Sequence, residues 1–414
     1  MWARLKTRGL VRDTVHLSLG QGLRLVIQAA YFVLIARSLG PDRYGAFVTV
    51  VAMAALAGPF SGLGTANLFI KNVRSAKRDA ASCWGNGILL TIISGTLLSG
   101  LAVAVSRLLE LKVASLTVAV VCVADLIFLK VTELAAAGFT ALDQMKQTSV
   151  QSVVVSLLRL CGIAALMAIA HAVTLERWVV VYLLTSMLGT IYAVRRGSQL
   201  WGRPTANWAA LREDAAEGVF FSIAGSATTV YNDIDKIMLS RLANLEATGV
   251  YAAAYLVIDV SMTPVRALAA AAYPQFFRKG LDGIGATYAY ALSLIAKAVL
   301  YGSAASAGLW LCAPLLPQLL GPKYAAAVPA VRWLALIPSL RCLHSFLADA
   351  LSGAGLQRTR TAIQVVVAIV NIGFNLVILP RYQWRGAAWT SLGCDGLLVV
   401  LFWSAAFFHQ RRQS

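Results

Sequence analysis

Twelve long apolar runs constrain this chain more than any other feature of its sequence. Each contains roughly 20 residues or more, the length that an α-helix needs to cross the ~30 Å hydrocarbon core of a bilayer. The runs lie at 15–38, 45–70, 82–106, 113–141, 148–171, 175–194, 216–241, 247–276, 286–313, 325–353, 361–380 and 386–409. Backbone polar groups inside lipid must find hydrogen-bond partners within the protein, which favours helices. We therefore predict an all-α polytopic membrane protein with about 12 transmembrane helices.

The composition supports this class and excludes several soluble ones. Hydrophobic residues make up 59% of the chain and charged residues only 13%, with a mean hydropathy of +0.72, whereas about 25% of residues are charged in a soluble domain. The formal net charge is +18, but the basic residues gather in short links between apolar runs, where lipid and orientation account for them. We expect no nucleic-acid partner. The six cysteines have no metal-ligand spacing, so we expect free thiols, no metal and no cofactor.

The distribution of basic residues predicts the orientation in the membrane. The links on the side of the two termini carry nineteen Lys and Arg residues, whereas those on the opposite side, counted with Arg177 and Arg241 at the ends of the adjoining runs, carry eight. The positive-inside rule therefore places both termini in the cytoplasm. The first apolar run is too long for the hydrophobic region of a signal peptide, so we expect an uncleaved first membrane helix.

An internal repeat divides the chain near its middle. The first set of paired positions, 204 residues apart, is Arg37 and Arg241, Asp42 and Glu246, Gly45 and Gly249, and Phe47 and Tyr251. A second set, 213 residues apart, pairs Gln144, Thr148, Gln151, Val153 and Val154 with Gln357, Thr361, Gln364, Val366 and Val367. Both sets fall at matching places of two six-helix halves. We predict two parallel lobes, 1–205 and 206–414, around a central cavity near the bilayer midplane.

Ionisable residues within the apolar runs indicate where a ligand could bind. Each costs ~2.5–3.5 kcal/mol on insertion, so such residues usually face protein or a wet cavity. The basic ones are Arg24, Lys130, Arg159, Arg266, Lys297, Arg332 and Arg341, and the acidic ones are Asp125, Glu133, Asp259, Asp349 and Asp395. A cavity lined by both signs, with cations in excess, would suit an anionic ligand.

Interruptions within two of the predicted helices narrow the choice of candidate ligand-binding residues. Gly and Pro break the second run around Pro59 and Gly62, and Pro264 breaks the eighth; paired interruptions in corresponding helices indicate the substrate path. Arg266 lies two residues after Pro264, and Arg24 follows a Gly-Gln-Gly segment in the first run. We favour both arginines as phosphate ligands because a guanidinium offers a planar fork of donors. Further candidate ligands are Lys297, Arg159 and Lys130.

Structural interpretations of the same residues stay open. Arg24 or Arg266 could form an ion pair with a buried carboxylate, and Asp259 lies seven residues before Arg266, on the same helix face. Lys130 and Glu133 have the i,i+3 spacing of an intrahelical pair. Asp259 and Asp349 are candidates for carrying a coupling proton, and a structural role is the alternative for each.

Four segments carry a resemblance to a known family: ARSLGPDRYGAF (36–47), NDIDKIMLSRLANLEATGVYAAAYLV (232–257), LGPKYAAAVPAVRWLAL (320–336) and NIGFNLVILPRYQWRGAAWTS (371–391). In this order they resemble the bacterial polysaccharide-export flippases of the Wzx type, which share a superfamily with lipid II flippases and multidrug-extrusion antiporters. The resemblance covers nearly the whole chain. Lipid II flippases use arginines of the first and eighth helices in a cationic cavity, and Arg24 and Arg266 occupy similar helices here.

The resemblance implies a flippase of the bacterial inner membrane. Such a protein moves a polyprenyl-diphosphate-linked oligosaccharide from the cytoplasmic to the periplasmic leaflet by alternating access, for surface or exopolysaccharide synthesis. Its partners would be this lipid-linked glycan, membrane lipid and a polysaccharide polymerase. The chain lacks the two extra helices of lipid II flippases, which argues against peptidoglycan precursor as the substrate.

Three other functions compete with this one. An ion-coupled drug or metabolite antiporter of the same fold would favour an acidic cavity, against which the deep cations argue. A membrane glycosyltransferase or polymerase would need a catalytic acid or His on a sizeable outer loop, and those links are short here, so we expect no enzyme. A scaffold for a polysaccharide-assembly complex is the third alternative.

Overall fold

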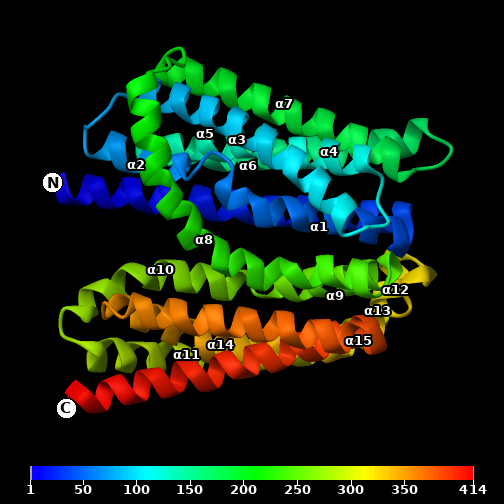
Figure 1. Cartoon of the computed structure of the whole chain (residues 1–414). Coiled ribbons are helices and arrows are strands. Elements are labelled where there is room, and N and C mark those ends of the chain that lie inside the picture. The colour runs from blue at the N-terminus through cyan, green and yellow to red at the C-terminus, as the bar shows by residue number, and fades with distance from the viewer. Residues whose placement is uncertain (1, 414) are drawn as a thin grey trace. The chain divides into compact units, whose positions relative to one another are not determined.

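The chain folds into helices throughout the part that the structure describes. The computed structural model describes the backbone of residues 2–413, and side chains within 22–411 apart from residues 209, 220, 224, 225, 227 and 228. In this part of the chain there is no β-strand, so the predicted all-α class is confirmed (Figure 1). The six cysteines are free, as expected.

The helices divide into two compact units by their contacts. Unit 1 comprises residues 1–39 and 49–229, and unit 2 comprises residues 40–48 and 230–414. The elements that lie in unit 1 or begin there are α1 (Trp2–Ala57), η1 (Gly58–Phe60), α2 (Thr65–Arg74), α3 (Ala80–Leu108), α4 (Ser115–Val123), η2 (Ala124–Leu129), α5 (Lys130–Ala141), α6 (Met145–Ile169), α7 (Leu175–Trp201) and α8 (Trp208–Leu242). The predicted lobe boundary at 205/206 stays a prediction, because these contacts do not test it.

The end of α8, from Val230 to Leu242, belongs to unit 2, as do residues 40–48. The elements that follow are α9 (Leu245–Ser261), α10 (Thr263–Gly280), α11 (Ile284–Cys312), η3 (Ala313–Leu315), α12 (Leu316–Leu320), η4 (Pro322–Tyr324), α13 (Ala327–Leu334), α14 (Ile337–Gly353) and α15 (Gln357–Gln413). Each of the twelve predicted spans lies in one or more of the helices of the two units.

Breaks within long helices separate neighbouring spans. Gly40 interrupts α1 with φ 71° and ψ 170°, directly before Pro41, and thus divides the first predicted span from the second. Gln383, with φ 50° and ψ −132°, divides α15 in the same way after Pro380. By length and composition, the described part of the chain has eight helices able to cross a membrane, or nine if the α9–α10 pair, bent by 48°, is one span.

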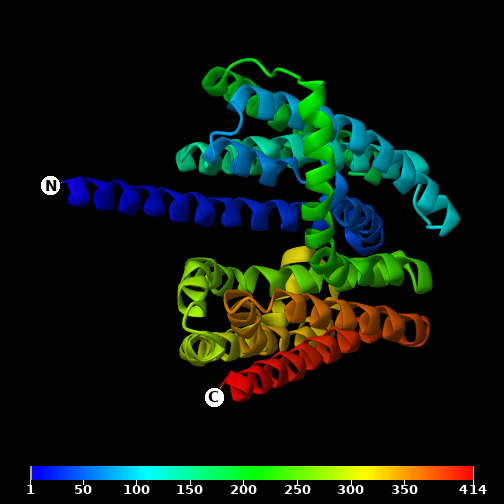
Figure 2. The ribbon, with the colours of Figure 1, turned by 60° about the vertical axis from the view of Figure 1, so that its left-hand side comes forward.

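A cluster of aromatic rings holds one end of unit 1 together. The ring centroid of Trp201, at the end of α7, lies 5.4 Å from those of Phe69 and Trp84 and 4.8 Å from that of Phe139. Trp84 and Phe139 are fully buried. The rings therefore join α2, α3, α5 and α7, while the first half of α8 runs steeply across the other unit 1 helices in both ribbon views (Figures 1 and 2).

Unit 2 has its core between α10, α11, α14 and α15. Phe276, Phe346 and Phe402 are at most 1% exposed and belong to one hydrophobic cluster. The indole Nε1 of Trp403 donates to the Leu343 carbonyl oxygen at 3.0 Å, which satisfies a polar group on the same helix as Phe402. This packing brings the last helix of the chain against α14.

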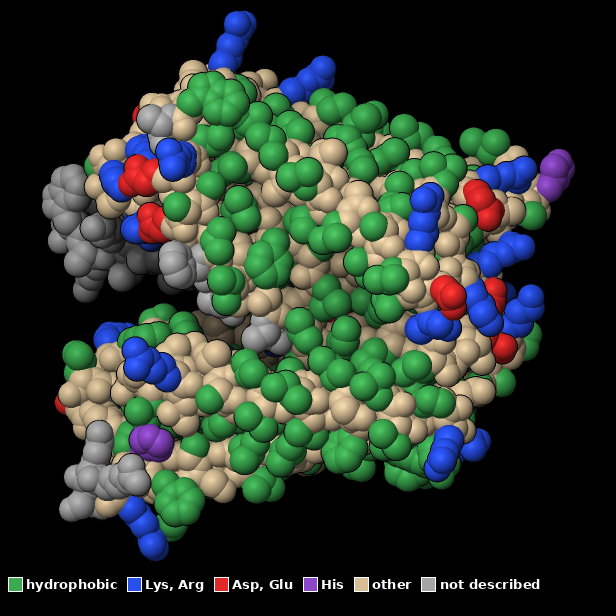
Figure 3. Space-filling view, in the orientation of Figure 1, with side chains coloured by type: hydrophobic (Ala, Val, Ile, Leu, Met, Phe, Trp, Pro, Cys, Tyr) green, Lys and Arg blue, Asp and Glu red, His purple; other side chains and the backbone are tan. Residues whose placement is uncertain are grey.

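The surface is apolar over the length of the helices, as expected of a protein surrounded by lipid. Many large aliphatic residues are more than half exposed, among them Leu97, Leu101, Leu108, Leu116, Ile169, Leu300, Leu311, Ile369 and Val377. Figure 3 shows hydrophobic side chains along the helices and most charged side chains near the helix ends. With the long apolar helices, this surface identifies a multi-pass membrane protein.

Candidate functional site

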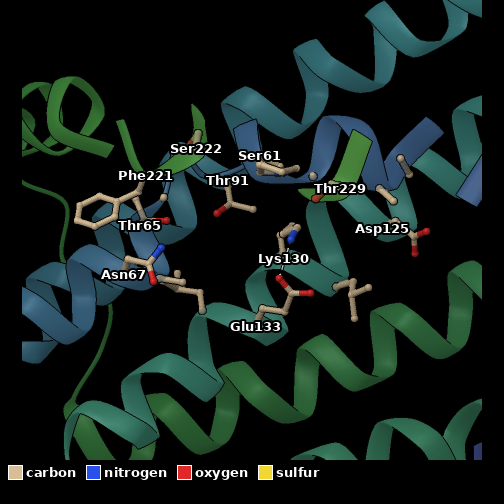
Figure 4. Close-up of a pocket in the computed structure, with 18 of the residues that line it drawn as sticks. Ser61, Thr65, Asn67, Thr91, Asp125, Lys130, Glu133, Phe221, Ser222 and Thr229 are labelled. Atoms are coloured by element: carbon tan, nitrogen blue, oxygen red, sulfur yellow. Dashed lines mark hydrogen bonds and ion pairs between the residues drawn. The ribbon is translucent and has the colours of Figure 1, made fainter. Parts of the chain in front are cut away.

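A cavity of about 510 Å³ lies within unit 1 (Figure 4). Its size falls within the ~300–1,000 Å³ range of small-molecule sites. Its walls come from the end of α1, the break after it, and α2, α3, η2, α5 and α8. The lining residues that carry the argument below are Pro59, Asn67, Asp125, Lys130, Glu133 and Phe221.

The break between α1 and α2 forms one wall. Gly62 and Gly64 have φ values of 72° and 67°, in the left-handed region that favours glycine. The Gly62 N–H donates to Ser94 Oγ at 2.8 Å, and the Ser61 hydroxyl donates to the Leu126 carbonyl oxygen. The predicted interruption of the second span is therefore present and is fastened to α3 and η2. Pro59 lines the cavity, whereas Gly62 lies behind its wall.

The break also lets α8 approach the segment between α1 and α2 closely. A methyl group added at Gly64 would lie 2.7 Å from the Gly218 carbonyl oxygen and 2.9 Å from Phe221 Cβ, and one added at Gly218 would lie 1.7 Å from the Leu63 carbonyl oxygen. Glycine at both positions is what admits this contact. As a result, the Phe221 ring forms part of the cavity wall, with 38% of the residue exposed.

One ion pair lies in the cavity. Lys130 Nζ is 2.7 Å from Glu133 Oε2, and Figure 4 shows the two side chains pointing toward one another. This is the intrahelical contact that their i,i+3 spacing predicts. A methyl group added at Gly58 would lie 3.4 Å from Lys130 Cε, so the lysine side chain lies over the helix break. Whether Lys130 also binds a ligand stays a prediction.

A second polar network reaches the cavity through a π-helical turn. Asp125 lies in η2, whose wider turn is of a kind often found at functional sites. The Tyr182 hydroxyl donates to Asp125 Oδ1 at 2.6 Å, and Arg159 Nη2 donates to the same hydroxyl at 3.0 Å. Arg159 also lies over the Tyr182 ring, with Cζ 4.6 Å from its centroid.

Sequence reasoning had no means of finding Tyr182, because it belongs to an ordinary apolar run and is 57 residues from Asp125. The network occupies part of the Arg159 guanidinium, but its Nε is buried without a hydrogen-bond partner among the described residues. Arg159 therefore keeps one unsatisfied donor.

Arg24 lies half-buried in α1 of the same unit. Within the described residues it has neither a hydrogen-bond nor an ion-pair partner, and it lies close enough to Arg159 for the two positive charges to repel one another. Like charges at depth in a membrane are costly unless an anion or water compensates them. The structure thus brings together two of the sequence-predicted cations without supplying Arg24 with an acidic partner.

In unit 2, Arg266 contacts Asp259 across a helix break rather than along one helix face, because α9 ends at Ser261 and α10 begins at Thr263 with a bend of 48°. Arg266 Nη1 is 2.6 Å from Asp259 Oδ1, and Pro264 lies in the first turn of α10. The two side chains are 53% and 40% exposed, so the pair is open rather than sealed in the core. The structural pair and the ligand role considered for Arg266 are both compatible with this geometry.

Lys297 lies in α11, which packs against the end of α9 and against α10. The Tyr301 hydroxyl donates to the Ser261 carbonyl oxygen at 2.7 Å, and the ring centroids of Phe276 and Tyr290 are 5.0 Å apart. Lys297 is exposed and has no hydrogen-bond or ion-pair partner among the described residues.

The other two candidate acids in the apolar runs of unit 2, Asp349 and Asp395, are engaged in hydrogen bonds. Asp349 accepts from Arg360 Nη1 at 3.1 Å. Asp395, 1% exposed, accepts from the Tyr231 hydroxyl at 2.9 Å, and its Oδ2 is 3.5 Å from Arg341 Nε. The coupling-proton role predicted for Asp259 and Asp349 is untested.

Comparisons with known proteins agree with this architecture. A family model described as "Polysaccharide biosynthesis protein" matches residues 10–279. No curated protein sequence matches the chain at a significant level.

The fold is similar to that of several solved transporters. An inward-facing multidrug resistance MATE family transporter of the MOP superfamily has a TM-score of 0.75 at 14% identity, over 94% of this chain and 97% of that one. The lipid II flippase MurJ in an inward closed conformation has a TM-score of 0.76 at 10% identity, over 95% and 87%. A MOP superfamily transporter from Pyrococcus furiosus has a TM-score of 0.66 at 15% identity, over 97% and 95%. At such low sequence identities, these similarities show a shared fold.

Proposed function

Because this chain belongs to the polysaccharide biosynthesis protein family and has the fold of MOP-superfamily transporters, we propose that it is a flippase for a polyprenyl-diphosphate-linked oligosaccharide. It would move the glycan from the cytoplasmic to the periplasmic leaflet of a bacterial inner membrane, with both termini in the cytoplasm. It would transport this lipid and not act as an enzyme on it. A polysaccharide polymerase would then use the delivered glycan.

The observation that carries the proposal is the arginine pair Arg24 and Arg159 in unit 1, for which the described residues supply a single carboxylate, Asp125, with Oδ1 4.0 Å from Arg159 Nη2. Arg24 has no acidic partner among the described residues and repels Arg159, whose Nε lacks a hydrogen-bond partner. A diphosphate would neutralise both charges and accept several guanidinium N–H groups. In unit 2, Arg266 and Lys297 are further candidate phosphate ligands, because both side chains are exposed.

Such a protein would move its substrate across the membrane without breaking or forming a covalent bond. The arginines would hold the charged diphosphate in a wet site while the polyprenyl tail stays in lipid. Access would then alternate between the two sides of the membrane. A coupling ion can drive this exchange only if it binds the two states with different affinity, and Asp259 and Asp349 are our candidates for carrying it.

An ion-coupled antiporter for an organic cation is the second candidate. The specific observation in its favour is the cavity of unit 1, whose lining contains the two carboxylates of Asp125 and Glu133 and the single ammonium of Lys130. The same fold occurs in multidrug resistance MATE family transporters.

The decisive experiment measures which leaflet holds the lipid-linked glycan. The gene is deleted, the lipid-linked oligosaccharide is radiolabelled in spheroplasts, and an impermeant glycosidase reports its exposure. We expect intact, protected glycan to accumulate in the deletion strain and to become accessible when the wild-type chain is restored. Restoration with Arg24→Ala should fail at equal protein level, whereas Arg203→Ala, in an exposed link, should succeed. Normal exposure of the glycan in the deletion strain would refute the flippase function.

A further inference from the structure

We propose that the cavity of unit 1 binds the sugar of the transported glycan that is attached to the diphosphate, an inference that rests on the proposed flippase function. The cavity and the arginine pair belong to one unit and are linked through shared contacts. Asp125 lines the cavity and accepts from the Tyr182 hydroxyl, to which Arg159 also donates. A diphosphate on Arg24 and Arg159 would therefore place its first sugar beside this cavity.

The charges in the cavity exclude the diphosphate itself. Lys130 is already ion-paired with Glu133 at 2.7 Å, and the lining adds the carboxylate of Asp125. A diphosphate has only acceptor oxygens and negative charge, so this lining, in which the single ammonium is already paired and the carboxylates offer no donor, gives it no net attraction. A neutral ligand carries no charge that would interact unfavourably with these carboxylates.

The same contacts argue against an organic cation. The Glu133 carboxylate is compensated by Lys130, and the Asp125 carboxylate receives the Tyr182 hydroxyl and faces Arg159 with Nη2 4.0 Å from Oδ1. Neither carboxylate is left without a partner of opposite charge or a hydrogen bond. The cavity is thus polar but electrically compensated, which favours a neutral, hydroxyl-rich ligand over a charged one.

The hydrogen-bonding groups fit a sugar. Each hydroxyl of a sugar both donates and accepts, so neighbouring hydroxyls can donate to Glu133 while accepting from Lys130, and bonds to charged groups are the stronger ones. The side-chain amide of Asn67 is exposed toward the cavity and has no hydrogen-bond partner in the described part of the chain. Figure 4 shows Asn67 and Glu133 on the lining with Lys130.

An aromatic ring completes the arrangement. Phe221 lies on the cavity wall with 38% of its surface exposed, and the close approach of Gly64 and Gly218 holds α8 there. The C–H face of a sugar ring is apolar and packs on an aromatic face. Hydroxyl and amide groups, a compensated ion pair and one exposed ring are a combination that suits a carbohydrate better than lipid.

The test compares two ligands that differ only in the glycan. The protein in lipid nanodiscs is titrated with undecaprenyl diphosphate and with the lipid-linked oligosaccharide extracted from the deletion strain, and both Kd values are measured. We expect the wild type to bind the glycolipid more tightly. Asn67→Ala and Phe221→Ala should each reduce this preference by roughly 3- to 10-fold, as loss of about 0.5–1.5 kcal/mol implies, and leave the Kd for undecaprenyl diphosphate unchanged.

Two controls keep the outcome interpretable. Phe407→Ala removes an equally exposed ring on α15 and should leave both Kd values unchanged. Phe221→Leu keeps most of the side-chain volume, so it tests the ring even if Phe221→Ala does not fold. An equal loss for both ligands, or no loss for either, would overturn the sugar assignment.

Failure of this inference is distinguishable from failure of the proposed function. Arg24→Ala should weaken binding of both lipids, and if it leaves undecaprenyl diphosphate unaffected, the diphosphate assignment fails whatever the cavity binds. Tetraphenylphosphonium is the third probe. Saturable binding of this cation that Glu133→Gln abolishes would assign the cavity to the antiporter function and overturn the sugar site.

Discussion

Gly45 and Gly249 meet in a contact that is symmetric under the internal repeat. A methyl group added at Gly45 would lie 1.8 Å from the Leu245 carbonyl oxygen, and one added at Gly249 would lie 1.9 Å from the Pro41 carbonyl oxygen. Leu245 and Pro41 are themselves 204 residues apart, as Gly45 and Gly249 are. All four belong to unit 2. The repeated motif is therefore used twice in one reciprocal backbone contact.

Either glycine should be intolerant of a side chain. Gly45→Ala and Gly249→Ala force a methyl group against backbone atoms, which cannot move as a flexible side chain can. We expect each to lower the free energy of unfolding by about 1–3 kcal/mol or more, measured as thermal unfolding in detergent micelles. Gly373→Ala is the matched control, because it is helical and has nothing within 4 Å of the added methyl group. Similar melting temperatures for all three variants would contradict the contact.

Arg266 should contribute to transport by binding the charged ligand and not only by compensating the charge of Asp259. Arg266→Ala should reduce glycan exposure at least roughly tenfold, the effect of losing about 1.5–3 kcal/mol from a hydrogen bond to a charged group. If Arg266 served only to compensate Asp259, then adding Asp259→Ala to Arg266→Ala would restore activity. We expect no rescue in the double variant. Recovery of the spheroplast signal would support the structural pair.

Ion pairs outside the membrane join the start of α8 to the link after α2, and one of them should respond to acid. Lys77 Nζ is 2.7 Å from Glu213 Oε1, and Arg78 also contacts Glu213. The hydrogen bond from Lys77 and the charges of Arg78 and Lys77 hold the pKa of the Glu213 carboxyl below its usual value.

The sign of the pH effect follows from that shift. Because the folded-state pKa lies below the unfolded one, the pairs stabilise the protein above the unfolded value of about 4.3. That contribution is lost as pH falls through the lower, folded pKa. Glu213→Gln should therefore melt at a slightly lower temperature than wild type at pH 7, and the gap should close as the pH falls below the folded-state pKa of Glu213. A difference in melting temperature that persists at low pH would mean that the charge of Glu213 does not cause it.

The orientation can be tested by labelling single cysteines. In a variant without the six native cysteines, Arg203→Cys should react with an impermeant maleimide only after the inner membrane is opened, because the positive-inside rule places it in the cytoplasm. Lys112→Cys, in a link of the opposite set, should react in intact spheroplasts. The reverse pattern would invert the predicted topology.

The sequence by itself determined the fold class and the places where helices stop. Apolar runs long enough to cross a bilayer must become helices, since no other local structure satisfies their backbone in lipid. The breaks at Gly40 and after Gly58 follow from local chemistry, and so does the i,i+3 contact of Lys130 with Glu133. These features depend on neighbours in the chain, so periodicity and residue type suffice to predict them.

Only the tertiary structure decided which polar groups share a site. The contact of Asp125 with Tyr182, the approach of Arg24 to Arg159 and the Phe221 wall of the cavity join segments far apart in the sequence. Only some side chains of an apolar helix point toward a neighbouring helix. Which ones do so depends on how the helices pack. Hydropathy is nearly the same on every face of such helices, because lipid and protein interior are both apolar. The sequence therefore indicated which charges are costly, and helix packing decided which of them are compensated.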